Sequence, residues 1–363
     1  MVVWYVILFL VFYFLCLCLS RPAAASEAPA DIQLVAVQMT LHLEDYWSSD
    51  AFTKRMTAIM GEVERCTDRD LPTLVVFPED IGLLLVLQGM EHRLQNVHSV
   101  AAGIQALTKA NLFPAIWNRM RYGLSWVPAL YLRRHKTIAE TYFSTFAQLA
   151  RAHGVYIAAG SVVLPPFAAV AGHAHRNSPL ARRVCNTSYL FGPTGEIIGK
   201  QDKVHLVELE QEAALDLMPG RLEDINVFAT PLGRLGIAIC LDAFQDDVVA
   251  ALKAKGAQIL IQPSANPGPW HKEQQADWLN SCHKRVCQQN GFVYGVNPML
   301  NGPFWDIGFF GQSSIVGCAT VATTPNSYAE LPPVQGFLRL AASPETDEIL
   351  VARVPHPDSV TPS

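Results

Sequence analysis

The alternation of apolar and polar positions over residues 31–363 predicts a mixed sheet covered by helices. Short apolar runs bounded by Pro, Gly or charged residues are typical of buried strands, and longer segments with apolar residues three or four positions apart are typical of helices. The two kinds of segment alternate along this chain. Strands are predicted at 32–39, 73–80, 155–163, 257–264, 292–298, 313–317 and 348–354. Helices are predicted at 50–66, 141–154, 246–256 and 272–290.

Two predicted hairpins interrupt this alternation. Residues 185–206 carry "GPTG" at their centre, and residues 225–240 carry "TPLG", so each reads as two strands joined by a tight turn. A hairpin pairs its strands antiparallel, whereas a strand–helix–strand unit pairs them parallel. The pattern therefore favours an α/β (α+β) fold with a mixed sheet over a purely parallel one.

One segment, at about residues 81–135, lacks a clear period. It is rich in Leu, Trp and Tyr. We expect it to form a lid or wall over a pocket, or a surface for a membrane or another subunit. A membrane span is disfavoured here because charged or ionisable residues are scattered through the segment. These are Glu91, His92, Arg93, Arg119 and Arg121.

The first thirty residues are predicted to lie apart from the fold. No charged side chain precedes Arg21, and about 18 apolar residues in a helix would extend ~27 Å, close to the ~30 Å of a bilayer core. The small residues at 23–25 fit a signal cleavage site, and an uncleaved single-span anchor fits equally. We expect a signal or transmembrane segment with a linker at 1–30, then one domain at 31–363. The protein would be membrane-associated or secreted, with the side of the membrane left open.

Composition narrows the possible partners and cofactors. The chain has 363 residues, half of them apolar, a net charge of −5 and no Lys/Arg-rich run, which argues against a nucleic-acid partner. Beyond the first thirty residues, the cysteines show no CxxC spacing, so neither a disulfide scaffold nor a zinc ribbon is indicated. The "HAH" at 173–175 is predicted to be a surface loop. We expect no metal and no organic cofactor.

Three residues form a chemical set, because each ends or follows a predicted strand. They are Glu79, Lys203 and Cys240, and strand ends are where an α/β scaffold gathers distant residues at one pocket. A cation near Cys240 would lower its pKa from about 8.5. Lys203 and the Leu241 backbone N–H would stabilise an oxyanion, and Glu79 would move protons. Taken singly, the three also suit a core thiol, a solvated lysine and a residue near a helix N-terminus.

The sequence around these residues resembles a known family. "LVVFPED", "GPTGEIIGKQDKVHL" and "GRLGIAICLD" are similar to the three signature blocks of the nitrilase superfamily, the carbon–nitrogen hydrolases, and the similarity covers about 32–318 apart from 81–135. It implies a four-layer α-β-β-α sandwich and a Glu79–Lys203–Cys240 catalytic triad. It also implies a homodimer or higher homo-oligomer paired through helices, with the tail after about 320 at the interface.

Many members of this family place a second glutamate a few residues after the lysine, where it hydrogen-bonds that lysine. "KVHLVELEQE" offers Glu208, Glu210 and Glu212, and we choose Glu210, seven residues after Lys203. Asp242 is expected to shape the turn at the nucleophile. In "QPSANPGPW", Asn266 and Trp270 are expected to contact the substrate.

The resemblance implies hydrolysis of a non-peptide carbon–nitrogen bond through a Cys thioester. The expected substrate is a small-molecule linear amide. Three alternatives stay open: an acyltransferase that uses the same thioester, hydrolysis of nitriles or N-carbamoyl compounds, and a membrane-tethered binding module with an inactive triad.

Overall fold

The computed structural model describes residues 31–110, 117, 120, 123–176, 183–211, 214–289, 291–318, 320–321 and 324–360. Asp31–Ser363 forms one compact unit. The segment predicted as a signal or anchor, residues 1–30, lies outside the described residues. Of the helices that the structure describes, none combines the length and the apolar character needed to cross a bilayer.

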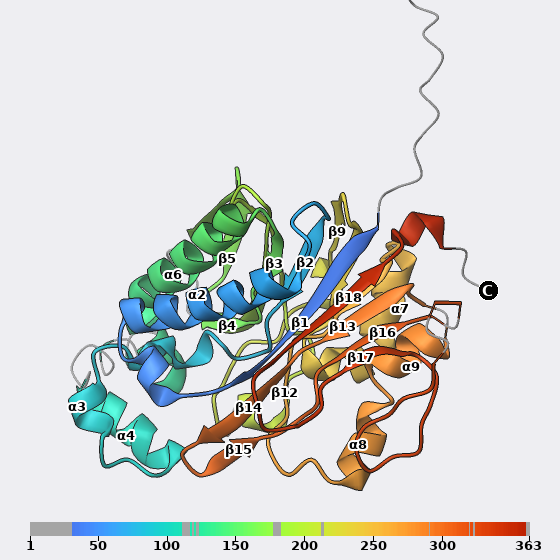
Figure 1. Ribbon diagram of the computed structural model, residues 1–363. Helices are drawn as coiled ribbons and strands as arrows, with labels where there is room; N and C mark the ends of the chain where they lie inside the picture. The colour runs from blue at the N-terminus through green and yellow to red at the C-terminus, as the bar shows by residue number, and fades with distance from the viewer. Residues whose placement is uncertain are drawn as a thin grey trace, which may run out of the picture. The chain divides into compact units, whose positions relative to one another are not determined.

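The described residues form two main sheets, drawn in Figure 1. The strands of the first are β1 Ile32–Thr40, β2 Thr73–Val76, β3 Tyr156–Ala158, β4 Val162–Leu164, β7 Cys185–Phe191, β8 Ile197–Asp202, β12 Ser264–Ala265, β14 Met299–Phe304, β15 Ile307–Phe309 and β18 Glu348–Val354. They run in the order β12-β14-β1-β2-β3-β7-β4, with β15 on β14, β18 on β1 and β8 on β7. Strands β1, β2 and β3 pair parallel, whereas β7 pairs antiparallel with β3 and β8, so this sheet is mixed.

The second sheet follows the order β17-β16-β13-β11-β10-β9. Its strands are β9 Val227–Thr230, β10 Gly233–Ile237, β11 Ile259–Ile261, β13 Tyr294–Asn297, β16 Ser314–Gly317 and β17 Phe337–Leu340. Both predicted hairpins are confirmed, as β7–β8 and β9–β10. The "HAH" prediction is wrong, because these residues belong to β6 (His173–Arg176), which pairs with β5 (Phe167–Val170).

Helices cover the outer faces of both sheets. They are α2 Ser49–Cys66, α3 Glu91–Leu94, α4 Val100–Ala110, α6 Trp126–His153, α7 Asp246–Ala254, α8 Lys272–Trp278 and α9 Cys282–Cys287. Three short 3-10 helices matter for the site: η2 Leu83–Leu87, η3 Glu208–Glu210 and η5 Cys240–Phe244.

The alternation of side chains along β1 divides the interior into two cores. Val35 and Val37 pack with α2 and α6 in one core. Leu34 and Ala36 face the other way and pack with the second sheet, α7 and α9. The layers are therefore helix, sheet, sheet and helix (Figure 1), which confirms the predicted four-layer α/β sandwich.

Two predicted helices have different limits in the structure. Helix α6 begins at Trp126, well before the predicted start at 141, because Pro128 lies in the first turn, where its missing N–H breaks no intrahelical bond. The last part of the 81–135 segment is therefore the first part of a core helix. The predicted helix 272–290 is divided into α8 and α9, and between them the Ser281 hydroxyl donates to the Trp278 carbonyl at 2.7 Å.

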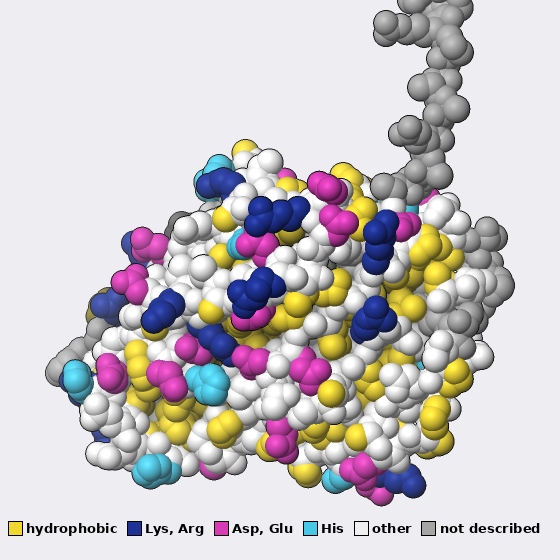
Figure 2. All heavy atoms as spheres, in the orientation of Figure 1, with side chains coloured by type: hydrophobic (Ala, Val, Ile, Leu, Met, Phe, Trp, Pro, Cys, Tyr) yellow, Lys and Arg dark blue, Asp and Glu magenta, His cyan; other side chains and the backbone are white. Residues whose placement is uncertain are grey.

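Charged side chains are interspersed on the face shown in Figure 2, which carries α2 and β18. Within this part of the fold, Arg55 on α2 pairs with Asp45 and with Asp347, which lies just before β18. These ion pairs connect the helix layer to the sheet it covers. Such surface pairs contribute modestly to stability, so the apolar contacts beneath α2 supply most of its attachment.

The predicted strand 155–163 is broken at Gly160, which turns the chain between β3 and β4. Its φ is +57°, and a Cβ there would lie 1.9 Å from the Pro78 carbonyl oxygen. Only glycine permits both the backbone conformation and this approach. Because Pro78 precedes Glu79, the packing at Gly160 fixes the loop that carries this glutamate.

We predict that Gly160→Ala destabilises the fold by roughly 3 kcal/mol or more, because the new Cβ must displace backbone. Gly154→Ala is the matched control: its φ is +64°, but a Cβ there meets nothing within 4 Å. The control should cost only the left-handed strain of about 1–2 kcal/mol. Urea unfolding midpoints measure both, and equal losses would contradict the proposed close approach.

Candidate active site

The three predicted residues meet where strands of both sheets end. Glu79 follows β2, Lys203 directly follows β8, and β8 runs parallel to β2 through the intervening β3 and β7. Cys240 follows β10 of the second sheet. All three line one cavity of about 50 Å³. The two sheets therefore bring together three residues that are far apart in the sequence. Their catalytic roles stay predictions.

Lys203 lies between two carboxylates. Its side chain is 1% exposed, and its Nζ lies 2.8 Å from Glu79 Oε1 and 2.6 Å from Glu210 Oε2. Burial alone would lower the pKa of Lys203, but the two glutamates outweigh burial and raise it well above its usual value. The ammonium has three N–H donors. Two serve the glutamates, which leaves one for the cavity that Lys203 lines.

Of Glu208, Glu210 and Glu212, the glutamate that the structure places in contact with Lys203 is Glu210. It is buried on η3, and its Oε2 also accepts from the Val207 N–H at 3.0 Å. Glu208 on the same turn is exposed. Glu212 lies outside the described residues.

Asn186 on β7 is a member of the cluster that sequence reasoning missed. Its Nδ2 donates to Glu79 Oε1 at 3.0 Å and to Glu210 Oε1 at 2.7 Å, so one amide orients both carboxylates. A signal was present in the sequence. The segment "CNTSYLF" opens a predicted hairpin yet holds three consecutive polar residues. The structure buries the whole strand, and buried polar groups need partners.

Glu79 also receives a hydrogen bond from a distant strand of the same sheet. The Ala265 N–H, on β12, donates to Glu79 Oε2 at 3.2 Å, and the Cys240 Sγ lies 3.9 Å from the Ala265 carbonyl oxygen. Burial raises the pKa of Glu79, Lys203 lowers it, and the charge of Glu210 raises it again, so that the pKa lies above its usual value. A carboxylate with a raised pKa is a better proton acceptor, which suits a general base.

Cys240 lies in a sharp turn between a strand and a 3-10 helix. Its φ is +47°, a strained value for a residue with a side chain, and its N–H donates to the Pro263 carbonyl at 2.9 Å. Leu241 is the second residue of η5, and N–H groups in a first helical turn have no acceptor within the helix. The Leu241 N–H therefore follows Cys240 in a first helical turn, where an oxyanion donor would be needed, and its oxyanion role stays a prediction.

Lys203 lowers the pKa of Cys240 as expected, but the net shift of that pKa is upward. Burial raises the pKa of this thiol, the charge of Glu79 raises it further, and Lys203 opposes them without prevailing. The resting sulfur therefore carries its proton. An attack by this sulfur needs a base to take its proton, and Glu79 lines the same cavity as Cys240.

Asp242 acts on a different segment from the one we expected. Its carboxylate accepts hydrogen bonds from the Val204 N–H at 3.1 Å and from the His205 N–H at 2.7 Å. Burial raises the pKa of Asp242 to about 6, although these two hydrogen bonds lower it. Asp242 thus fastens the chain that follows Lys203 to the turn that carries Cys240.

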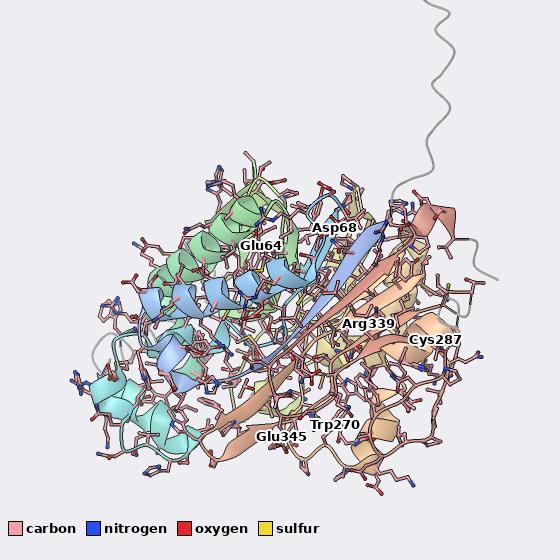
Figure 3. The ribbon with its side chains drawn as sticks, viewed as in Figure 1. Glu64, Asp68, Trp270, Cys287, Arg339 and Glu345 are labelled. Carbon is pink, nitrogen blue, oxygen red and sulfur yellow. The ribbon has the colours of Figure 1, made fainter. Side chains whose placement is uncertain are left out.

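Asn266 and Trp270, predicted to contact substrate, are not among the described residues that line the cavity. Asn266 Nδ2 donates to the Phe310 carbonyl at 3.0 Å. Trp270, labelled in Figure 3, is packed against Trp278 and Tyr328 in the core around the second sheet. In the structure Trp270 is thus part of the core and Asn266 holds the Phe310 carbonyl, and substrate contact stays a prediction for both.

Two further features complete the cavity wall. Asp80, next to Glu79, lines the cavity with a φ of +65°. Burial, followed by the charges of the two neighbouring glutamates, raises the pKa of Asp80 well above its usual value. Leu83 and Val100 also line the cavity, which places part of the 81–135 segment at the site. The described residues hold no cluster of His, Cys, Asp or Glu suited to a metal ion.

Comparison with known proteins gives a consistent result. The sequence pattern of a family described as "Carbon-nitrogen hydrolase" matches residues 112–326. The chain is 26% identical over 146 residues to "Omega-amidase NIT2" of Xenopus tropicalis, which covers 37% of this chain and 47% of that protein. It is 30% identical over 125 residues to "Deaminated glutathione amidase" of Yersinia enterocolitica, covering 32% and 39%. These matches span less than half the length of either relative.

Solved structures share the fold over nearly the whole chain. An amidase from Nesterenkonia sp. AN1 aligns with a TM-score of 0.54 at 19% identity, over 90% of this chain and 96% of that one. Nit3 of Saccharomyces cerevisiae, a member of the nitrilase superfamily, aligns with a TM-score of 0.56 at 17% identity, over 93% and 95%. At these identities the likeness establishes the fold.

The electrostatics of the cluster make a prediction about the thiol. Because the charge of Glu79 raises the pKa of Cys240, Glu79→Gln should lower that pKa and let iodoacetamide alkylate Cys240 at lower pH than in the wild type. Peptide mass spectrometry across a pH series measures this. Cys66, which is exposed, serves as the internal reference, and the exposed Glu208→Gln as the matched control. An unchanged or higher alkylation pH would contradict the arrangement.

Proposed function

The chain belongs to the carbon–nitrogen hydrolase family, and on that basis we propose that it hydrolyses a linear amide through a thioester on Cys240. The observation that carries the proposal is the buried cluster around Lys203. Glu79 contacts the lysine at 2.8 Å, and Glu79, Lys203 and Cys240 all line one cavity. A nucleophile, a base and a fixed cation are the groups that acyl transfer from an amide requires.

In the proposed first step, the Cys240 sulfur attacks the amide carbonyl carbon while Glu79 takes the thiol proton. The carbonyl oxygen becomes an oxyanion, which accepts hydrogen bonds from Lys203 Nζ and the Leu241 N–H. The C–N bond then breaks. Glu79 returns its proton to the departing nitrogen, so that ammonia or an amine leaves and the acyl group stays on sulfur.

In the proposed second step, Glu79 takes a proton from water as the water oxygen attacks the thioester carbonyl. The same two donors stabilise the second oxyanion. The C–S bond breaks, the sulfur regains a proton from Glu79, and the carboxylic acid leaves. Glu210 and Asn186 take no proton in this scheme and act as positioning residues, because they hold Lys203 and Glu79 in place.

The names of the relatives support an amide as the substrate. The two curated relatives and the Nesterenkonia enzyme are all named amidases. A screen for ammonia release over amides, nitriles and N-carbamoyl compounds tests this choice. Faster release from nitriles or N-carbamoyl compounds would overturn the amide proposal. Transfer of the acyl group to an added amine, in preference to water, would overturn hydrolysis in favour of acyl transfer.

Location and assembly are separate proposals. We propose, from the sequence alone, that residues 1–30 direct the chain to a membrane or a secretory route, which protease protection in whole cells tests. We also propose that the folded unit forms a homodimer or higher homo-oligomer, supported by the family resemblance. Light scattering of the purified protein tests that assembly.

We predict that Cys240→Ala lowers amide turnover by on the order of 10⁴-fold, because no other group can form the thioester. Peptide mass spectrometry after acid quench should find the acyl group on Cys240 of the wild type. Cys287→Ala is the matched control: Cys287, labelled in Figure 3, lies at the end of α9, and this variant should retain activity. Turnover in Cys240→Ala equal to wild type would exclude the mechanism.

The acid limb of the pH profile of kcat/KM should follow protonation of Glu79, whose pKa is raised. Activity is lost as the pH falls through that pKa, so the limb lies above the ordinary glutamate range. Glu210→Gln removes a charge that raises the pKa of Glu79, and should therefore move the limb to lower pH. Glu208→Gln, on the exposed side of the same turn, should leave it in place. A limb that shifts upward in Glu210→Gln would contradict the assignment.

A further inference from the structure

A second cavity lies against the catalytic one. It has a volume of about 60 Å³ and is lined by η2, α4, the first turns of α6 and the tip of the β14–β15 hairpin. We call it the apolar chamber. Every described residue that lines it is aliphatic or aromatic. Among these described lining residues, polar side-chain atoms are present only on Trp305 and Tyr131. The Tyr131 hydroxyl donates to the Leu83 carbonyl at 2.8 Å.

The apolar chamber and the catalytic cavity share a wall of four side chains: Leu83, Val100, Leu215 and Phe304. These residues come from four different segments of the chain: η2, α4, the stretch after η3 and β14. Their side chains line both spaces and so form the partition between them. A chain attached to a carbonyl at Cys240 would meet this wall first and the apolar chamber behind it.

The chamber is built by the segment at 81–135 that the family resemblance leaves out. Helix α4 lies beside the tip of the β14–β15 hairpin (Figure 1), where the Val100 N–H donates to Asp306 Oδ1 at 2.8 Å. On the next turn, a Cβ at Gly103 would lie 2.2 Å from the Trp305 ring, so only glycine lets the ring approach the helix this closely. These contacts hold α4 as one side of the chamber.

Charge at the site selects against an anionic chain. Among the described residues that line the catalytic cavity, Lys203 is the one basic group, and it is already paired with two of the three acidic side chains there. Neither cavity offers a further cation among its described lining residues. A carboxylate on the far end of a substrate would lose its water without gaining a partner.

Resting on the proposed amide hydrolysis, we propose that the substrate is a primary amide with a neutral, unbranched apolar acyl chain, and that this chain occupies the apolar chamber. A cavity needs about 10–15 Å³ of volume to hold one water molecule. On that scale the chamber has room for roughly four to six methylene-sized or water-sized groups. Acyl chains a few methylenes longer than acetyl would fill it. Longer chains would exceed it.

Rates over acetamide, butanamide, hexanamide and octanamide test the proposal. We expect kcat/KM to rise about fourfold for each added methylene, the equivalent of ~0.8 kcal/mol of burial, until the chamber is full. Glutaric acid monoamide should react at least about tenfold more slowly than the neutral amide of the same chain length. N-hexyl acetamide carries its chain on the nitrogen, so its kcat/KM should not exceed that of acetamide.

Variants on α4 locate the chain. Ile104 lines the apolar chamber but not the catalytic cavity. Ile104→Phe should fill the chamber and so lower the hexanamide-to-acetamide ratio of kcat/KM about tenfold. Leu107→Ala, which enlarges the chamber, should move the preferred length upward, and it keeps the test valid if Ile104→Phe does not fold. Gln105→Phe, on the exposed face of the same helix, is the matched control and should leave the ratio unchanged.

The outcomes separate the two proposals. If the wild type hydrolyses none of these amides, the proposed function itself is overturned. If it hydrolyses them with no gain from chain length, prefers the glutaric acid monoamide or favours N-hexyl acetamide over hexanamide, the chamber proposal alone is overturned. The chamber proposal would also be overturned if Ile104→Phe left the hexanamide-to-acetamide ratio of kcat/KM at its wild-type value.

Discussion

The burial of Lys203 between Glu79 and Glu210 is the constraint around which the site is organised. A cation removed from water is costly unless carboxylates and further hydrogen bonds surround it. Here two carboxylates pair with it, and Asn186 holds both of them. These four side chains come from the ends of β2, β7, β8 and η3. The cluster can be satisfied only if all four elements are in place, so its electrostatics depend on the complete sheet.

The second sheet is tied to this cluster through the turn that follows β10. The carboxylate of Asp242, in that turn, accepts from two backbone N–H groups beyond Lys203. Cys240 is thereby fixed relative to residues of the first sheet, although its own strand belongs to the second. The proposed nucleophile is thus positioned across the sandwich, which explains why a thiol from an apolar core lines a cavity together with Glu79.

Elements defined by local pattern could be predicted from the sequence. The apolar face of α2 includes Phe52, Met56, Ile59 and Val63 as its spacing indicates, and both hairpins follow from their turn residues. Strands β14 and β15 were missed because Gly302 and Pro303 interrupt the apolar run and disfavour a strand. The start of α6 was missed because no residue between Trp126 and 141 marks a boundary.

Within the site, the sequence predicted which residues meet but not their charge states. Glu79, Lys203 and Cys240 each have a distinctive local context, whereas Asn186 acquires its importance only from partners far along the chain. The direction of the shift in the pKa of Cys240 depends on burial and on the summed charge of the cluster, neither of which is visible in a linear pattern. The inward turn of Trp270 likewise follows from the core around the second sheet.

The protonated state of the resting Cys240 has a consequence for the lifetime of the protein under oxidative stress. Peroxides oxidise thiolates much faster than thiols, and irreversible oxidation of this sulfur would end turnover. Burial and the charge of Glu79 raise the pKa of this thiol and so keep the sulfur protonated. In the proposed mechanism, the arrangement that leaves Cys240 inert between turnovers would thus also shield it from chemical damage.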